Sequence, residues 1–129
     1  MRFSALIIPL TVFLLSACAS TDTVKEAQGQ GVKRSYPYGY DRVYNAVLAA
    51  AKAKELEVTE NDRAGGRLTL SHGVTALSWG ERIAVFISRP SATSTEVEIV
   101  SKPVLAPLNF PPDWPKILFD QIDAELRAS

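Results

Sequence analysis

The sequence predicts an α+β fold, in which an antiparallel sheet of four to five strands packs against two helices in the order β-α-β-β-β-β-α. Three observations predict it. A stripe of apolar residues at helical spacing occupies 40–56, short stretches with alternating apolar residues follow up to residue 101, and a second helical stripe closes the chain. Two helices on one face of such a sheet form a two-layer sandwich.

The first strand is expected in "VKRSY", because Pro37 ends it. The helix that follows, "YDRVYNAVLAAAKAKEL", is rich in strong helix formers. Asp41 in its first turn and Lys52 in its last turn both favour the helix dipole. A strand and a helix are therefore expected before the main part of the sheet.

The middle of the chain predicts a hairpin and two further strands. "LEVTE" and "RLTLSH" alternate on either side of the turn "NDRAGG". "ERIAVFIS" is apolar on both faces, which predicts a central strand or a partly covered outer face. After a turn in "RPSATS", "TEVEIVS" places Val97 and Ile99 inward, and Glu96 and Glu98 outward in solvent.

The Pro-rich "KPVLAPLNFPPDWP" ends the sheet, because proline cannot continue it. The last helix, "DWPKILFDQIDAELRAS", has Asp113 as its expected N-cap and Pro115 in its first turn. Its expected buried stripe consists of Leu118, Phe119, Ile122 and Leu126.

A leader is expected before this domain. Arg2 supplies a positive start, and the apolar stretch "FSALIIPLTVFLLSA" is shorter than the roughly 20 apolar residues that span a bilayer. We expect a signal peptide over 1–17, a lipidated cysteine with a flexible tether over 18–31, and one α+β domain over 32–129. The tether is expected because "ASTDTVKEAQGQG" is small and polar.

The single cysteine, Cys18, follows a leucine and two small residues. "LSAC" resembles the lipobox of bacterial lipoproteins, in this position a specific motif. The resemblance implies that a diacylglyceryl group is joined to the thiol and that the leader is cut before Cys18. Ala19 rather than Asp follows, which implies the outer membrane with the domain facing the periplasm. Two alternatives stay open: the periplasmic side of the inner membrane, and an ordinary leader that leaves a free thiol.

The element order from Val32 to Leu126 is similar to the helix-grip domains of small Gram-negative envelope lipoproteins, among them a lipoprotein subunit of the β-barrel assembly machinery. "YDRVYNAVLAA" and "VTENDRAGGRLTL" also resemble lipoprotein domain families. The chain departs from them at Glu55, where glycine often closes the helix. The resemblance implies no functional residues.

Composition excludes several classes. Basic and acidic side chains number 14 each, and loss of the leader with Arg2 leaves a net charge of −1. No basic excess exists for nucleic-acid binding. One cysteine forms no internal disulfide, so stability depends on a packed core.

The sequence predicts no enzyme, metal or cofactor. His72 is the one histidine and is expected at a turn or on the surface, and Cys18 is taken up by lipid. Asp120 and Asp123 are expected on a solvated helix face.

The candidate partner-binding residues are Trp79, Phe110 and Trp114, in or beside the loops of the domain. Folding back onto the core is the favoured interpretation, and an exposed apolar patch is the alternative. The sequence thus predicts a membrane-anchored, non-catalytic module for protein interaction or structure, with envelope proteins as partners. The alternative function is binding of a small apolar ligand or lipid between the sheet and the last helix.

Overall fold

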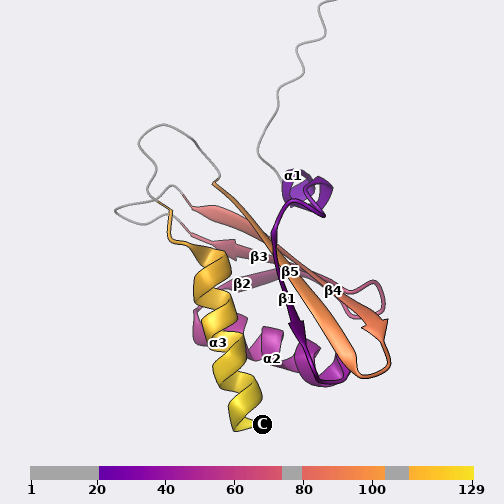
Figure 1. Cartoon of the computed structure of the whole chain (residues 1–129). Coiled ribbons are helices and arrows are strands. Elements are labelled where there is room, and N and C mark those ends of the chain that lie inside the picture. The colour runs from indigo at the N-terminus through magenta and orange to yellow at the C-terminus, as the bar shows by residue number, and fades with distance from the viewer. Residues whose placement is uncertain (1–20, 74–79, 104–110) are drawn as a thin grey trace, which may run out of the picture.

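The computed structural model describes residues 21–73, 80–103 and 111–129. Its elements are α1 (Thr21–Glu26), β1 (Val32–Tyr36), α2 (Tyr40–Ala53), β2 (Glu57–Asp62), β3 (Arg67–His72), β4 (Glu81–Ser91), β5 (Ser94–Pro103) and α3 (Trp114–Ala128). The five strands form one antiparallel sheet in the order β1-β5-β4-β3-β2 (Figure 1). The predicted fold class and strand order along the chain are confirmed, with α1 as an additional element.

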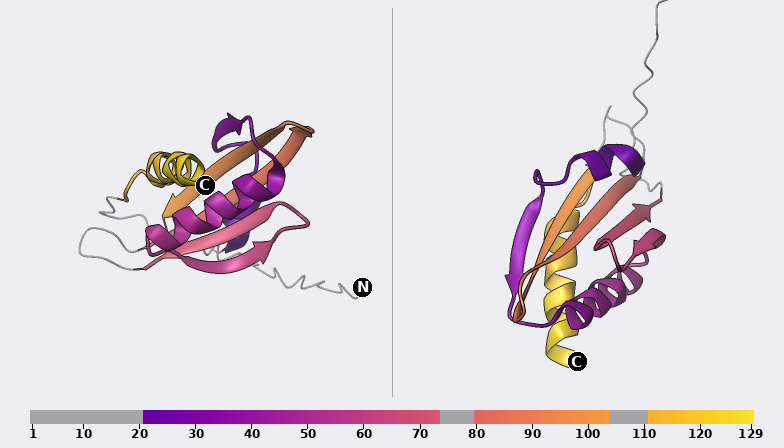
Figure 2. Two further views of the ribbon diagram at one scale, coloured as in Figure 1. Left: turned by 90° about the horizontal axis from the view of Figure 1, so that it is seen from below. Right: turned by 90° about the vertical axis from the view of Figure 1, so that its right-hand side faces the viewer.

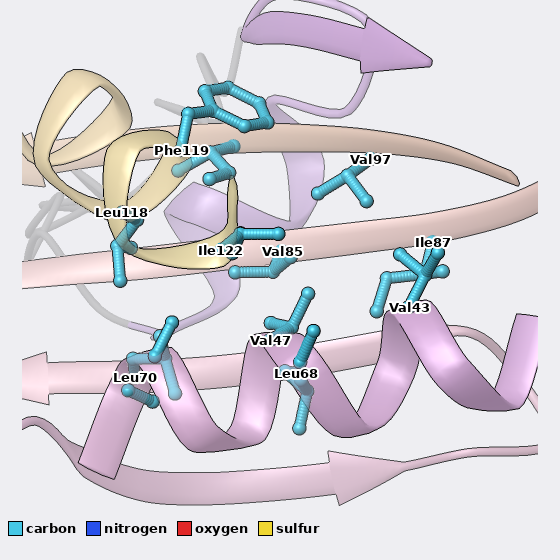
Figure 3. Close-up of a cluster of buried hydrophobic side chains, with 14 of the residues drawn as sticks. Val43, Val47, Leu68, Leu70, Val85, Ile87, Val97, Leu118, Phe119 and Ile122 are labelled. Carbon is cyan, nitrogen blue, oxygen red and sulfur yellow. The ribbon is translucent and has the colours of Figure 1, made fainter. Parts of the chain in front are cut away.

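Helices α2 and α3 cover one face of the sheet in the helix-grip arrangement, whereas α1 lies on the other face (Figure 2). Side chains from both layers fill the space between the helices and the sheet (Figure 3). Ten of these side chains are at most 4% exposed: Val43, Val47, Leu68, Leu70, Val85, Ile87, Val97, Leu118, Phe119 and Ile122. Burial of each large side chain contributes about 1.5–3 kcal/mol, so this core supplies most of the stability.

The end of α2 explains the departure at Glu55. The helix ends at Ala53, and Glu55 adopts the left-handed backbone conformation with a φ of 57°. The Leu56 amide then donates to the carbonyl of Ala51 over 2.9 Å, which closes the helix. Glycine adopts this conformation without the Cβ clash, which costs about 1–2 kcal/mol for other residues. The chain therefore closes α2 with a left-handed residue other than glycine, which is the usual residue for this conformation.

Helix α3 begins and packs as predicted. The Asp113 side chain accepts a hydrogen bond from the backbone amide of Lys116, at 3.2 Å, and the predicted stripe is buried. Asp123, expected in solvent, instead connects α3 to β1. It accepts hydrogen bonds from the Tyr36 hydroxyl at 2.9 Å and from Arg34 at 2.8 Å. Burial, and then the hydrogen bond to Asp123, raise the pKa of Tyr36.

Strands β4 and β5 are longer than predicted. The expected turn "RPSATS" belongs largely to them, since β4 continues through Pro90 to Ser91 and β5 begins at Ser94. The register shifts between Ser88 and Ser91, so Pro90 occupies an irregular part of the ladder where a missing amide donor is tolerated.

The predicted flexible tether over 18–31 is wrong for residues 21–31. This stretch contains α1, and Val24 and Ala27 are only 0% and 5% exposed. The physical reason lies in the sheet, because Ala84 and Phe86 of β4 and Val100 of β5 form an apolar patch on the outer face that needs cover. None of the described helices is long and apolar enough to cross a membrane.

Candidate functional site

Residues 24–31, called here the N-terminal segment, pack across the outer face of the sheet. Their apolar contact is with β4 and β5, and the residues in this contact are Val24, Ala27, Ala84, Phe86 and Val100. Ala84 and Phe86 are the residues that made β4 apolar on both faces in the sequence. The second apolar face therefore belongs to this intramolecular contact.

A buried carboxylate fixes the end of this segment. Glu98 is 4% exposed, and both of its oxygens accept a hydrogen bond from the Gly29 amide, at 2.9 and 2.8 Å. One of them also accepts the Gly31 amide at 2.9 Å. A Cβ at Gly31 would lie 2.5 Å from the Ile99 carbonyl oxygen, so the close approach requires glycine. The prediction that Glu98 is solvated is wrong, because the N-terminal segment covers it.

An ion-pair network holds the other side of this segment. Lys25 pairs with one oxygen of Glu60, and Arg67 donates to the other oxygen at 3.1 Å. The Lys25 hydrogen bond, supported by Arg67 and opposed by partial burial, holds the pKa of Glu60 below its ordinary value. Glu60 therefore stays ionised at a lower pH than an ordinary glutamate and keeps α1 linked to β2 and β3.

One end of the sheet, called here the α1 end, lies where β3 ends at His72, β4 begins at Glu81 and β5 ends at Pro103. Nδ1 of His72 lies 2.7 Å from the Glu81 carboxylate, which is fully buried. The His72 ring contacts the Trp114 ring, with 4.8 Å between the ring centroids and a tilt of 56°. The Trp114 indole nitrogen has no hydrogen-bond partner in the part of the chain described. His72 was expected at a turn or on the surface. Its side chain is only 22% exposed and pairs with the buried carboxylate of Glu81.

The opposite end, called the Tyr40 end, lies where β1 stops at Tyr36 and α2 starts at Tyr40. A depression of about 460 Å³ opens between the start of α2, the turn before β3 and the far part of β4. At this end of the sheet arginines stack on tyrosines, with guanidinium-to-ring distances of 4.2 Å for Arg63 on Tyr44 and 5.0 Å for Arg89 on Tyr40. A third pair, Arg42 on Tyr38 at 4.2 Å, lies outside the depression.

The two arginines that line this depression differ in their partners. Arg63 donates to Asp41 at 3.0 Å and to Asn45 at 2.7 Å. Arg89 has no carboxylate partner among the described residues, and its guanidinium is held only by Tyr40. Stacking orders the side chain in advance, which lowers the entropy cost of a contact. Arg89 is therefore a pre-ordered positive charge that lines the depression.

The predicted site residues divide into two groups. Cys18, Trp79 and Phe110 lie outside the described residues. Trp114 is 5% exposed and belongs to the core, as the favoured interpretation expects for this residue, and for Trp79 and Phe110 that interpretation stays a prediction. Among the residues described, no group of three or more His, Cys, Asp or Glu side chains could hold a metal ion.

Sequence reasoning missed Glu98, Arg63 and Arg89. Glu98 alternates with apolar residues in the same way as Glu96. No local pattern in the sequence distinguishes a carboxylate that another segment covers from one that stays in solvent. The available signal was the pair of apolar faces in β4, which required a covering segment. The arginines come together only through the packing of α2 beside the β2–β3 turn.

Comparison with known proteins finds distant structural likenesses. No protein-family model matches the chain, and no curated protein matches its sequence. Among solved structures, the crystal structure of Ara h 8.0201 is similar over 76% of this chain and 96% of that chain, with 8% identity and a TM-score of 0.46. The crystal structure of TTHA0849 from Thermus thermophilus is similar over 75% and 95%, with 14% identity and a TM-score of 0.35. These distant likenesses concern the helix-grip arrangement and carry no argument about function.

The Glu98 carboxylate yields the first prediction. Glu98→Gln keeps the shape but removes the charge and turns an amide group toward the Gly29 and Gly31 donors. We expect the N-terminal segment to open more readily by about 1–3 kcal/mol. Hydrogen exchange of residues 24–31 measures the change. Glu96→Gln, on the same face of β5, is the matched control and should leave that exchange unaltered, whereas equal protection in both variants contradicts the role of Glu98.

Proposed function

We propose that this chain is a lipid-anchored protein of a bacterial envelope and that its folded domain binds another protein. The observation that carries the proposal is the lipobox-like "LSAC" directly in front of a domain that folds from its first described residues. The anchor decides where the domain lies, and the Tyr40 end offers the surface for a partner.

The anchor follows from the residues around Cys18. Two or three acyl chains on this residue would give nearly permanent membrane attachment, because each buried methylene contributes about 0.8 kcal/mol. Ala19 in place of an aspartate supports the outer membrane and a periplasmic domain. Cys18 precedes Thr21 by three positions, which span at most about 10 Å. With the N-terminal segment packed on the sheet, the domain stays close to the lipid surface.

This geometry orients the domain. Helix α1 contacts Ala84 and Val100, close to the α1 end of β4 and β5 (Figure 1). The α1 end therefore faces the membrane, and the Tyr40 end points away from it. The eleven residues of β4 separate these ends by about 30 Å.

The Tyr40 end fits a protein partner by its chemistry. Tyrosine and arginine are enriched among the residues that dominate binding energy. Arg89, stacked and without a carboxylate of its own in the described chain, suits an acidic side chain of the partner. The depression of about 460 Å³ beside it suits one protruding side chain or turn.

The anchor is tested by mass. In a Gram-negative host, the mature protein should begin at Cys18 and carry the mass of two or three acyl chains, and globomycin should cause the uncut, lipid-bearing precursor to accumulate. Cys18→Ser should abolish both the added mass and the cleavage before residue 18. A mature protein with a free thiol would end the proposal of an anchor.

The partner surface is tested by photo-crosslinking in living cells. A crosslinking amino acid at Ala64, which lines the depression, should give one discrete adduct, whereas the same residue at Lys52, exposed near the other end of α2, should not. Arg89→Ala should lower the Ala64 adduct about tenfold, as expected for a contact of roughly 1.4 kcal/mol. Equal, diffuse adducts from both positions would contradict a partner at the Tyr40 end.

A second candidate is binding of a small apolar ligand or lipid. The helix-grip arrangement favours it, since α2 and α3 enclose an apolar interior against the sheet. The unpaired indole nitrogen of Trp114, which has no partner in the described chain, is a donor at the edge of this interior that a ligand oxygen could accept. Against it stands the burial of the ten side chains labelled in Figure 3, each of which is at most 4% exposed.

Native mass spectrometry separates the two candidates. For the protein purified from cells, we expect no mass beyond that of the chain and its acyl groups, because side chains occupy the described interior. A retained small molecule, lost in a variant that fills the edge of the interior such as Ala50→Leu, would favour the ligand carrier instead.

A further inference from the structure

The α1 end carries two cations that lie directly opposite each other on adjacent strands, on the same face of the sheet. Arg82 of β4 pairs in register with Lys102 of β5, so both side chains lie on the outer face. Both are partly exposed, and Arg82 donates to the Ser71 hydroxyl at 2.6 Å. In the portion of the chain that the structure describes, neither has a carboxylate partner. Like charges directly opposite each other destabilise a sheet, and within the described residues no carboxylate offsets this repulsion.

Two acids of the neighbouring sheet positions do not pair with Arg82 or Lys102. Glu81 is adjacent to Arg82 in sequence but lies on the other face, where it is buried against His72. Glu57 lies in the same row on β2, two strands from Arg82, which corresponds to about 10 Å. The pair therefore presents two positive charges at one edge of the outer face.

The location of the pair indicates what compensates it. Ala84 and Val100, the next cross-strand pair on the same face, are covered by α1. Arg82 and Lys102 thus lie beside the helix that begins three positions after Cys18. Whatever holds Cys18 lies within reach of these two cations.

We propose that Arg82 and Lys102 bind anionic phospholipid headgroups, so that the α1 end rests on the membrane surface. This proposal rests on the proposed lipid anchor and adds a second contact to it. Near an anionic surface each basic residue contributes about fivefold to binding. The acyl chains hold the protein at the membrane, and the basic contact holds the α1 end of the domain against its surface.

Two glycines allow matched probes of this contact. A Cβ at Gly73, which follows β3 at the α1 end, or at Gly39, which precedes α2 at the Tyr40 end, meets no atom within 4 Å. Both residues are exposed. Because lipid occupies Cys18 in the proposal, Gly73→Cys and Gly39→Cys each create one thiol for a fluorescent dye.

The experiment uses the full-length protein, matured in cells and reconstituted in vesicles that contain an acceptor-labelled lipid. In vesicles with one third phosphatidylglycerol, energy transfer from position 73 should exceed that from position 39. Replacing phosphatidylglycerol by phosphatidylcholine should reduce the transfer from position 73. The variant Arg82→Gln/Lys102→Gln should lower the ratio of docked to undocked domain about 25-fold, and Lys102→Gln alone about fivefold. Arg89→Gln, on the same strand near the Tyr40 end, should leave the ratio of docked to undocked domain unchanged.

The outcomes separate the two proposals. Protein that takes up two dyes per chain or fails to float with vesicles overturns the anchor. Protein that floats, with transfer from position 73 independent of phosphatidylglycerol and of both variants, overturns the headgroup contact and leaves the anchor standing. Thermal unfolding of the variants at or above the parent temperature is expected, because they remove a repulsion.

Discussion

The structure depends on a constraint in the sheet: strand β4 is apolar on both faces, and Val100 of β5 extends its outer apolar face. Helices α2 and α3 cover one face, and Ala84, Phe86 and Val100 on the other would meet water if the chain began at β1. The N-terminal segment removes these residues from solvent, and its amides then satisfy the carboxylate of Glu98. Covering this face brings residues 24–31 into the folded domain and shortens the link to Cys18.

The sequence predicted the fold because its strong signals are local. Alternation in "RLTLSH" and "ERIAVFIS", and the stripes of α2 and α3, give the period of each element directly. The folding of the N-terminal segment was not predicted, because "ASTDTVKEAQGQG" is polar and has no apolar period. Its fold depends on contact with β4 and β5. The depression at the Tyr40 end escaped because α2 and the β2–β3 turn are brought together only in three dimensions.

The two ends of the sheet differ in how their charges are held. Around the Tyr40 end, arginines are stacked on tyrosines and are ordered before any partner arrives. At the α1 end, Arg82 and Lys102 face each other without a stacked ring or a carboxylate in the described chain. The first arrangement suits selective recognition, whereas the second suits a diffuse negative surface. This difference supports assigning a protein to one end and lipid to the other.

The hydrogen bonds of Gly29 and Gly31 to Glu98 also bear on biogenesis. Once they form, little free chain remains between the folded domain and Cys18, and a membrane-embedded enzyme needs an extended substrate around its target bond. If Cys18 is processed as proposed, acyl transfer and leader cleavage compete in time with closure of the N-terminal segment. Under that proposal, the order of these events decides maturation, because early closure leaves little extended chain next to Cys18.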